Sequence, residues 1–429
     1  MKNIAFFWEK EDFSSFDYKQ LLENNPGIGG SEYMMLVISC LLSLRNNGLN
    51  VKIYALKKLP NDIPFFYTVV ESFDKAVLMA VNEGFECLVF KHDSSLIKKH
   101  VLEQINANIK LIPWCHLFLR EEELDYYSKM SSVESLIFVG REQRDLYRDH
   151  LMFKKTLFIY NCVNVEQYLL KSKFVPFALR KPIVTYMGCI TSVKGLHWLA
   201  MVWKDIIKEI PDAELYIIGS GRLYDKQQIL GPYGIAEENY EKLILGYLSD
   251  DDGKLLSNVH FKGVLGKEKN EILMQTKVGV ANPSGKSETF CITAVEMQLC
   301  GAKVITALTP GTLDTVKNGF LYRDTRELKD LIIKILKYNN QDDNDYMNSI
   351  EYIDKNFSIN RVVERWESFF RGELQYDDKI INRYYRLKIL KEVFRRVKEA
   401  KPCLYNFIPC IEKIILFVER YLSKTRVKY

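Results

Sequence analysis

Short apolar runs alternate along the chain with longer stretches in which apolar residues recur every three or four positions. In the first part of the chain the short runs occupy residues 4–7, 51–55, 87–90, 110–112, 136–139 and 157–159. The alternation restarts at 184–187 and continues at 215–218, 259–262, 278–280, 303–306 and 320–322. Continuous apolar runs of this length are typical of strands buried on both faces, with helices covering the sheet between them. The pattern therefore predicts an α/β protein with two parallel sheets.

The two series of strands predict two Rossmann-like, doubly wound domains that face a cleft. Pro176 and Pro182 interrupt the polar stretch between the series and indicate a linker there. We place the first domain at residues 1–175 and the second at 180–355, followed after residue 371 by a basic helical tail, 372–429. Because ligands of doubly wound sheets bind beyond the carboxyl ends of the strands, we expect the functional residues in the loops at those ends.

Residues 277–306 form the most informative stretch, KVGVANPSGKSETFCITAVEMQLCGAKVIT. The pattern predicts a strand around 278–280, a turn at 282–287, a helix at 290–300 and a strand at 303–306. Such a turn leaves the backbone N–H groups of Thr289, Phe290 and Cys291 at a helix start, where donors lack intrahelical partners and the helix dipole is positive. This place suits a phosphate group.

Two carboxylates flank that helix start. Glu288 precedes the helix and Glu296 lies two turns into it, so their Cα atoms are roughly 12 Å apart at 1.5 Å per residue. That separation is too large for a shared proton or a shared metal ion. It suits the two ends of one elongated ligand whose diphosphate rests between them, which is the layout of a nucleoside diphosphate sugar.

The spacing of Glu288 and Glu296 resembles the E-x7-E motif of retaining glycosyltransferases of the GT-B fold, and the flanking Asn282-Pro283-Ser284 resembles family 4 of that group. The resemblance implies that Glu288 acts at the donor sugar and that Glu296 binds the ribose hydroxyls. It also implies that residues 356–371 form a helix that crosses back to the first domain.

In the first domain the resemblance points to a glycine loop and a histidine. The loop ends in Gly27-Ile28-Gly29-Gly30-Ser31-Glu32, where Ser31 can cap the following helix and side-chain-free Gly29 and Gly30 allow a ligand close to the backbone. The family's loop faces the donor phosphates and the reaction centre. His116 follows a predicted strand, at the place where the family carries a histidine near the donor sugar. His92 is a weaker candidate, which a surface loop would explain equally well.

In the second domain, Gly188, Lys194 and Gly195 match the family's diphosphate-binding segment, in which an arginine follows the first glycine. Here Cys189 takes that place, and a thiol cannot replace a guanidinium fork. We therefore expect Lys194 to carry more of the diphosphate binding, with Arg222 as a candidate substitute for the arginine. By the same resemblance, Val264 and Leu265 belong to the loop that receives the nucleobase.

Composition excludes several other classes. With 47% hydrophobic and 13% aromatic residues the chain is globular, and its nine cysteines never occur as C-x2-C, which argues against zinc and disulfide frameworks. Asp250-Asp251-Asp252 sits in a polar turn rather than after a strand, so we do not expect a D-x-D metal site. Gly279 and Gly285 are too far apart for a Walker A loop. We expect no cofactor, no required metal, no secretion and no membrane span, hence a cytoplasmic protein.

The tail carries most of the positive charge. Residues 372–429 contain 14 Lys and Arg against 7 Asp and Glu, whereas the whole chain has a net charge of +5. We predict a basic amphipathic helix at 380–397 and a second apolar set at 408–422. Both could pack on the first domain, or they could lie on an anionic membrane at the inner face. The apolar positions of the first helix are Ile380, Tyr384, Leu387, Leu390, Phe394 and Val397, and the basic ones are Arg383, Arg386, Lys391, Arg395 and Lys398.

Together these features predict a retaining, metal-independent glycosyltransferase. The expected partners are a nucleotide-sugar donor and a saccharide or lipid-linked saccharide acceptor. A GT-B epimerase or hydrolase of nucleotide sugars is the nearest alternative, distinguished by whether the product requires an acceptor. A non-enzymatic nucleotide-binding or nucleic-acid-binding protein that uses the basic tail is a further alternative, but the paired glutamates and cleft glycines argue against it, so we do not expect nucleic acid as a partner.

Overall fold

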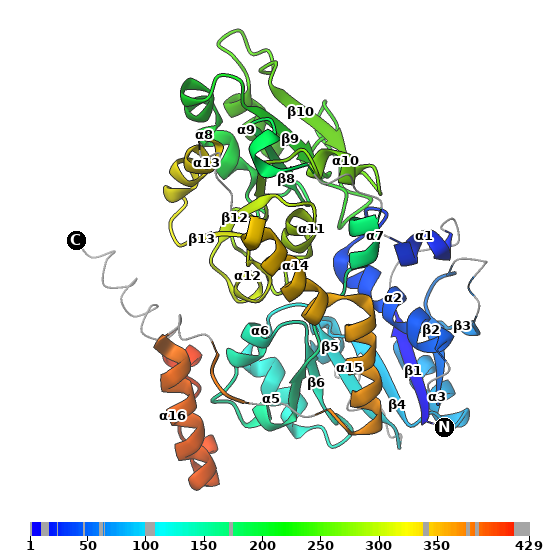
Figure 1. The fold of residues 1–429 in the computed structure, drawn as a ribbon. Coiled ribbons are helices and arrows are strands. Elements are labelled where there is room, and N and C mark those ends of the chain that lie inside the picture. The colour runs from blue at the N-terminus through cyan, green and yellow to red at the C-terminus, as the bar shows by residue number, and fades with distance from the viewer. Residues whose placement is uncertain are drawn as a thin grey trace.

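The computed structural model describes residues 2–9, 17–23, 25–45, 48–59, 63, 65–98, 108–170, 175–337, 343–374, 378–381 and 386–415. Within these ranges the chain forms two parallel sheets, each in its own domain, and a separate helix near the carboxyl end (Figure 1). The predicted α/β fold class with two doubly wound domains is confirmed.

The first sheet has seven strands in the order β3-β2-β1-β4-β5-β6-β7, all parallel. Six were predicted, and the edge strand β3 was missed because only three residues of it pair. The central strand β5 continues through Pro113 to Cys115, beyond its predicted end at residue 112. The strands are β1 (Lys2–Trp8), β2 (Leu49–Ala55), β3 (Tyr67–Val69), β4 (Cys87–Lys91), β5 (Lys110–Cys115), β6 (Leu136–Phe138) and β7 (Thr156–Phe158).

Helices connect these strands. The longest, α2, buries a continuous apolar stretch from Tyr33 to Ile38, which explains how the glycine loop before it is held against the sheet. The α-helices of this domain are α1 (Tyr18–Glu23), α2 (Gly30–Leu44), α3 (Phe73–Asn82), α4 (Ser94–Lys98), α5 (Glu121–Lys129), α6 (Arg141–Asp145) and α7 (Val165–Leu170).

The second sheet has six parallel strands in the order β10-β9-β8-β11-β12-β13. Its order reverses between β8 and β11, so the loops after these two strands open onto the same crevice, as in other doubly wound sheets. The strands are β8 (Ile183–Met187), β9 (Glu214–Ile218), β10 (Val259–Gly263), β11 (Val278–Val280), β12 (Lys303–Ala307) and β13 (Gly319–Tyr322). The helices are α8 (Leu196–Glu209), α9 (Glu238–Leu248), α10 (Lys269–Leu273), α11 (Ile292–Leu299), α12 (Pro310–Thr315) and α13 (Glu327–Lys337).

Two helices return the chain to the first domain. After α14 (Asp343–Phe357) the chain turns at Ser358 into α15 (Ile359–Arg371), which lies along the first sheet (Figure 1). The ring of Trp366 packs edge-on against Trp114 of β5, with ring centroids 4.8 Å apart. A helix therefore crosses back where one was expected.

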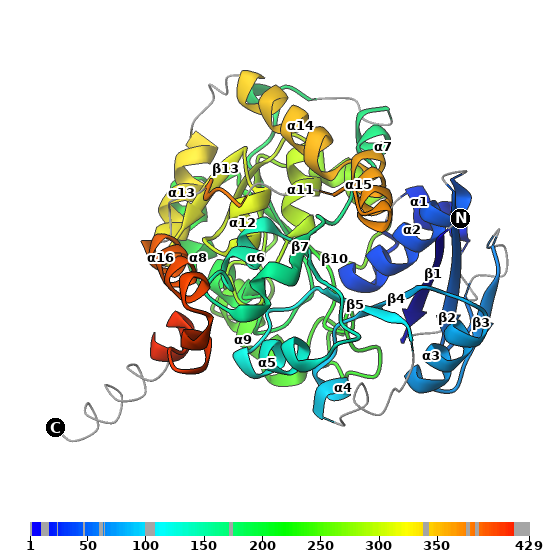
Figure 2. The same cartoon turned by 90° about the horizontal axis from the view of Figure 1, so that it is seen from below.

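The tail helix α16 (Arg386–Ala400) lies against the first domain beside α6, at the edge of the molecule (Figures 1 and 2). Packing on the first domain was one of the two predicted outcomes, but the buried side differs from the expected one. Lys391 and Lys398 are buried, whereas Leu390 and Val397 are exposed. The reason is that the first domain offers acidic side chains and backbone carbonyls at this place rather than an apolar groove.

Parts of the predicted tail pattern fall outside the described residues, namely Arg383, Tyr384, Val418 and Leu422. Ile380 is described but lies before the helix. Of the second apolar set, Ile411 is buried, and its backbone N–H donates to Asp149 on the first domain at 2.6 Å. Within the described ranges, no helix combines the length and the apolar character that a membrane span requires.

Candidate active site

A cavity of about 580 Å³ lies between the two domains at the carboxyl ends of their strands. Both domains contribute to its wall. From the first domain come the loop 27–32 and the residues Lys91, His116, Leu117 and Asn161. From the second come residues around Gly188 and Lys194, Tyr224, Val264 and Leu265, Lys269, and the stretch 287–293 with Glu296.

The turn between β11 and α11 holds an unusual backbone. Asn282, Ser287 and Cys291 all have positive φ values, 39°, 54° and 49°, although none is glycine. Left-handed backbone at such residues costs of order 1–3 kcal/mol each and is found where surrounding contacts hold it in place. Cys291 is the N-cap residue of α11, which begins at Ile292. The predicted helix start at residue 290 was therefore two residues early.

Glu288 is fixed by three donors. Its Oε2 accepts from Lys194 Nζ at 2.9 Å and from Asn282 Nδ2 at 2.8 Å, and its Oε1 accepts from the Cys291 backbone N–H at 2.8 Å. The Cys291 N–H is therefore not free for a phosphate, contrary to the prediction. Ile292 and Thr293 line the cavity at the true helix start, so their N–H groups are the candidate phosphate donors.

Lys194 approaches Glu288 from the segment after β8. Burial lowers the pKa of Lys194, but the Glu288 carboxylate outweighs that effect and raises the pKa above its usual value. The ammonium group therefore stays charged inside the cavity. An anionic ligand placed beside Lys194 could accept a charge-assisted hydrogen bond from this partly desolvated ammonium group.

Glu296 lies deeper in the same cavity and is also paired. Its Oε1 accepts from Lys269 Nζ at 2.7 Å and from the Tyr168 hydroxyl at 2.8 Å. Lys269 comes from α10 and Tyr168 from α7, so residues from both sides of the linker orient this carboxylate. Among the described residues both of these hydrogen bonds fall on Oε1.

The glycine loop brings a second ion pair into the wall. Gly29 is the N-cap residue of α2 and no side chain caps this helix, so Ser31 does not have the predicted capping role. Ser31 and Lys91 instead donate to Glu32 at 2.8 and 2.6 Å. Burial alone would raise the pKa of Glu32, but these two donors lower it to about 2. A Cβ on Gly29 would lie 2.3 Å from Glu32 Oε2, so a side chain there would displace the Glu32 carboxylate.

His116 lines the cavity directly after β5. Its Nε2 is buried and has no hydrogen-bond partner among the described residues. Burial, followed by the Lys91 charge, lowers the pKa of His116 to about 3, so the ring is neutral at physiological pH. The His116 carbonyl also accepts from Thr289 Oγ1 at 2.7 Å, which links the two domains beside Glu288.

The other predicted residues are placed as follows. Gly29, Gly30, Thr289, Phe290, Cys291, Val264 and Leu265 all line the cavity with Lys194, Glu288, Glu296 and His116. Gly195 and Arg222 are not part of the wall. A Cβ on Gly195 would lie 2.6 Å from the Ser284 backbone nitrogen, so its role is packing. The Arg222 guanidinium donates to the Gln228 carbonyl at 2.8 Å in an exposed loop.

Two further sequence candidates have structural roles. The Cys189 thiol is fully buried and lies 3.9 Å from the Gly221 carbonyl oxygen. His92 is buried rather than in a surface loop, and its Nδ1 lies 2.8 Å from the Tyr127 hydroxyl. Asp250 accepts from the Asp252 and Lys254 backbone N–H groups, as a turn residue does.

Sequence reasoning assigned no role to several charged and polar residues of the cavity wall, among them Glu32, Lys91, Asn161, Tyr224 and Lys269. Glu32 and Lys91 carried usable signals, because Glu32 follows the glycine loop directly and Lys91 ends a buried strand at its carboxyl end. Lys269 had none, since a lysine on a short polar helix usually points to solvent. Its partner Glu296 is 27 positions away.

Comparisons with known proteins agree with this geometry. Residues 181–338 match the family model described as glycosyl transferases group 1. An uncharacterized glycosyltransferase of Haemophilus influenzae is 26% identical over 177 residues, which are 40% of this chain and 48% of the relative. The chain thus spans about half the length of that curated relative.

Solved structures extend the likeness to most of the chain. Sucrose-phosphate synthase from Thermosynechococcus elongatus superposes with a TM-score of 0.59 at 16% identity, over 87% of this chain and 99% of that one. HepE of Anabaena in complex with UDP superposes with a TM-score of 0.61 at 14% identity, over 87% and 100%. Residues 181–338 are therefore similar to the glycosyl transferases of group 1, and the whole chain has the GT-B fold, in which two Rossmann-like domains are paired.

Proposed function

We propose that this protein transfers a sugar from a nucleoside diphosphate sugar to a hydroxyl acceptor, with retention of the anomeric configuration and without a required metal ion. The observation that carries the proposal is the pair Glu288 and Glu296, which line one cavity and are each held by a lysine, Lys194 and Lys269. A fixed carboxylate at either end of a cavity suits an elongated ligand with hydroxyl groups at both ends.

The donor would lie along α11. Glu296 Oε2 would accept from the ribose hydroxyls, Lys194 and the N–H groups at Ile292 and Thr293 would hold the diphosphate, and Glu288 would face the sugar. Val264 and Leu265 would contact the nucleobase. Support for a nucleoside diphosphate comes from HepE, whose complexes contain UDP, and UDP with glucose. Because HepE is only 14% identical to this chain, the base and the sugar stay open.

The reaction would break the bond between the anomeric carbon and the diphosphate oxygen. The acceptor oxygen would form its bond on the same face, and its proton would pass to the departing diphosphate. Lys194 and the start of α11 would stabilise the charge that develops on the leaving group. The neutral His116, which belongs to the cavity wall, would contact the sugar.

The acceptor would enter from the first-domain side of the cavity, past Glu32, Lys91 and Leu117. We propose a saccharide or a lipid-linked saccharide, since the paired charges of Glu32 and Lys91 can bind hydroxyl groups by donating and by accepting. A lipid-linked acceptor would bring a cytoplasmic protein to the inner face of a membrane.

A thermal-shift screen with UDP, GDP, ADP and their sugars tests the donor first. A ligand that binds only the folded chain raises its stability by RT ln(1 + [L]/Kd), so one nucleotide should raise the melting temperature and the others should not. Glu296→Gln should reduce that shift, whereas Glu271→Gln, an exposed change on α10, should not.

The preferred nucleotide sugar is then incubated with and without acceptor saccharides. Product that needs an acceptor supports a transferase, and product formed without one supports the hydrolase or epimerase alternative. If no nucleotide shifts the melting temperature, the proposed donor site is wrong.

A further inference from the structure

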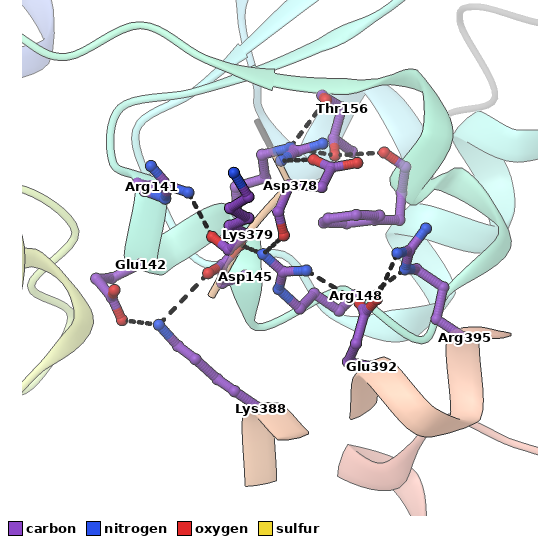
Figure 3. Close-up of polar contacts among 12 residues, drawn as sticks. Arg141, Glu142, Asp145, Arg148, Thr156, Asp378, Lys379, Lys388, Glu392 and Arg395 are labelled. Carbon is purple, nitrogen blue, oxygen red and sulfur yellow. Dashed lines mark hydrogen bonds and ion pairs between the residues drawn. The ribbon is translucent and has the colours of Figure 1, made fainter. Parts of the chain in front are cut away.

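The tail helix α16 is docked on the first domain by charged side chains (Figure 3). Lys388 Nζ contacts Glu142 and lies 3.4 Å from Asp145. Arg148 pairs with Asp145 at 2.9 Å and with Glu392 of α16 at 3.0 Å. Because buried charges are costly unless they are paired, this network specifies which side of the helix faces the domain.

Backbone groups complete the docking. Lys391 Nζ donates to the Leu146 carbonyl at 2.6 Å and Lys398 Nζ to the Asp149 carbonyl at 2.9 Å. Lys388, Lys391 and Lys398 are each at most 2% exposed. Rotation of the helix about its axis would strip all three ammonium groups of their partners, so the observed orientation is held firmly.

This orientation turns the apolar side of α16 outward. Ile389, Leu390, Val393 and Val397 lie on the side opposite the buried lysines and are 50%, 44%, 50% and 48% exposed; we call these four residues the outer stripe. An amphipathic helix of a soluble domain normally buries such residues and exposes its lysines. Exposed apolar patches of this kind mark surfaces that contact another molecule.

Charge around the outer stripe indicates what that molecule is. Arg396 borders the stripe with a side chain 76% exposed, although it also pairs with Glu392 at 3.0 Å. Lys401 beyond the end of the helix is exposed, and Lys413, 57% exposed, lies 4.0 Å from Glu121 of the first domain. The sequence that follows residue 415 contains four basic residues, Arg420, Lys424, Arg426 and Lys428, against one acidic residue, Glu419. Apolar residues bordered by cations are typical of helices that lie in the interface of anionic bilayers.

We propose that the outer stripe, together with the exposed Phe407, lies in the headgroup layer of an anionic lipid bilayer. The buried lysines then hold the helix at a fixed angle on the first domain, and the exposed cations contact the lipid phosphates. A pair of copies joined through the same stripe would bring their cations together, which opposes dimer formation.

Vesicle flotation of the full chain tests the proposal. Vesicles of phosphatidylcholine alone are compared with vesicles that also contain phosphatidylglycerol, at low and at high salt. We expect binding to the phosphatidylglycerol vesicles and release at high salt, because exposed cations are screened.

Polar substitution of the outer stripe distinguishes binding through its apolar residues from non-specific attraction between basic residues and anionic lipids. The double variant Val393→Asn with Val397→Asn should bind vesicles about tenfold more weakly, since a few tens of Å² of apolar surface per side chain no longer leave water. The matched control, Leu78→Asn with Leu243→Asn, changes two exposed residues on α3 and α9 and should bind as the wild type does. Lys401→Gln with Lys413→Gln should weaken binding at low salt, and Lys208→Gln with Lys242→Gln should not.

Two results would overturn the proposal. One is vesicle binding that the stripe variant leaves unchanged. The other is a dimer, seen by sedimentation without vesicles and abolished by the stripe variant, in a protein that does not bind vesicles. Donor-induced thermal shifts should be equal in all these variants, so failure here is distinguishable from failure of the donor site. Deletion of the tail is no substitute, because it would remove Lys388 from Glu142 and Asp145 and Glu392 from Arg148.

Discussion

At the scale of single residues, the charged side chains of the cavity wall are already paired with one another. A ligand that binds one of them would therefore share it with its partner. Glu296 Oε1 accepts hydrogen bonds from both Lys269 and Tyr168. Removing the side chain altogether would leave Lys269 buried without a partner, at a cost of about 3–5 kcal/mol to folding. Binding and folding effects are therefore separated only by a substitution that keeps the shape.

Glu296→Gln meets that requirement. The amide oxygen can still accept from Lys269 and Tyr168, while the charged acceptor for the ribose is lost. We expect nucleoside diphosphate affinity to fall roughly tenfold, in line with about 1.5–3 kcal/mol for a hydrogen bond to a charged group. Calorimetry with the diphosphate alone measures the change. Full affinity in Glu296→Gln would remove Glu296 from the donor site.

Glu288→Gln should act differently, because we propose that Glu288 faces the sugar of the donor. We expect turnover to fall by about tenfold or more, with nucleotide affinity within a factor of about two of the wild type, since the lost interaction is worth most in the transition state. Initial rates at saturating donor, set beside calorimetry, separate the two quantities. If turnover is unchanged, Glu288 only positions Lys194.

Lys194→Met tests the diphosphate contact. Glu288 keeps the Asn282 and Cys291 donors in this variant, so we expect a loss of about 1–2 kcal/mol or less in unfolding free energy but a much larger loss of donor affinity. Cys189→Arg, which restores the family's usual residue, should give no gain, because the Cys189 side chain is fully buried at the cavity wall and a guanidinium would displace its neighbours. A gain in donor affinity would show that an arginine can reach the cavity from this position.

At the scale of elements, the turn before α11 stores backbone strain next to Glu288. Ser287 is exposed and has a φ of 54°. Because it is exposed, its side chain contributes little to the free energy of unfolding. Ser287→Gly should raise the unfolding free energy by up to about 1 kcal/mol, because glycine adopts this backbone without steric cost.

Urea unfolding measures that change, with Ser257→Gly as the control. Ser257 is also exposed, but its φ is not among the positive values, so glycine there should lower stability by about 0.4–1 kcal/mol through the unfolded chain. Equal effects of the two substitutions would mean that the turn at Ser287 is not strained.

The elements also show why sequence patterns predict some features and not others. Long apolar runs identified twelve of the thirteen strands, since burial on both faces leaves a signal in the run itself. The start of α11 was misplaced because Cys291 is an N-cap residue in a left-handed conformation, and cysteine does not signal that state. For α16 the periodicity correctly predicted a two-sided helix. Which side is buried depended on Glu142, Asp145 and Asp149, more than 200 positions away.

At the scale of the whole molecule, a buried acid joins the domains outside the cavity. Asp314 of α12 accepts from the Glu142 backbone N–H at 2.9 Å and from the Tyr160 hydroxyl at 3.2 Å. Burial, and then the nearby Glu142 charge, raise the pKa of Asp314 from 3.8 to about 7. The folded chain therefore binds this proton more tightly than the unfolded chain does.

The stability of the folded chain should therefore fall as the pH rises. For a carboxyl group whose folded pKa is raised, the stabilisation is complete below pH 4 and is lost as the pH rises toward 7. Asp314→Asn, which resembles the protonated form, should flatten this part of the stability curve and raise the melting temperature at pH 8. Thermal unfolding between pH 5 and pH 8 gives the comparison. An equally steep curve in the variant would assign the effect to other groups.

The site as a whole was predictable in part. Glu288, Lys194 and His116 were predicted to line the cavity because they lie in loops at strand ends, where the topology alone brings side chains together. Glu296 was predicted from its spacing to Glu288, since it lies on α11. Lys269 and Tyr168 were not found, since they act through Glu296 and reach it from a short helix and from beyond the linker. Residues that position another site residue in this way depend on distances in the folded chain, which spacing along the sequence does not reveal.

The chain leaves the first domain and returns to it at one place. The Val163 backbone N–H donates to the Phe357 carbonyl at 2.8 Å, and the Ile359 N–H donates to the Val163 carbonyl at 3.2 Å. Topologically, the second domain is thus an insertion into the first domain, and two hydrogen bonds join its entry to its exit. The segment between residues 163 and 359 could therefore be exchanged between relatives without moving either end of the first domain. Such an exchange would combine the donor preference of one protein with the acceptor preference of another.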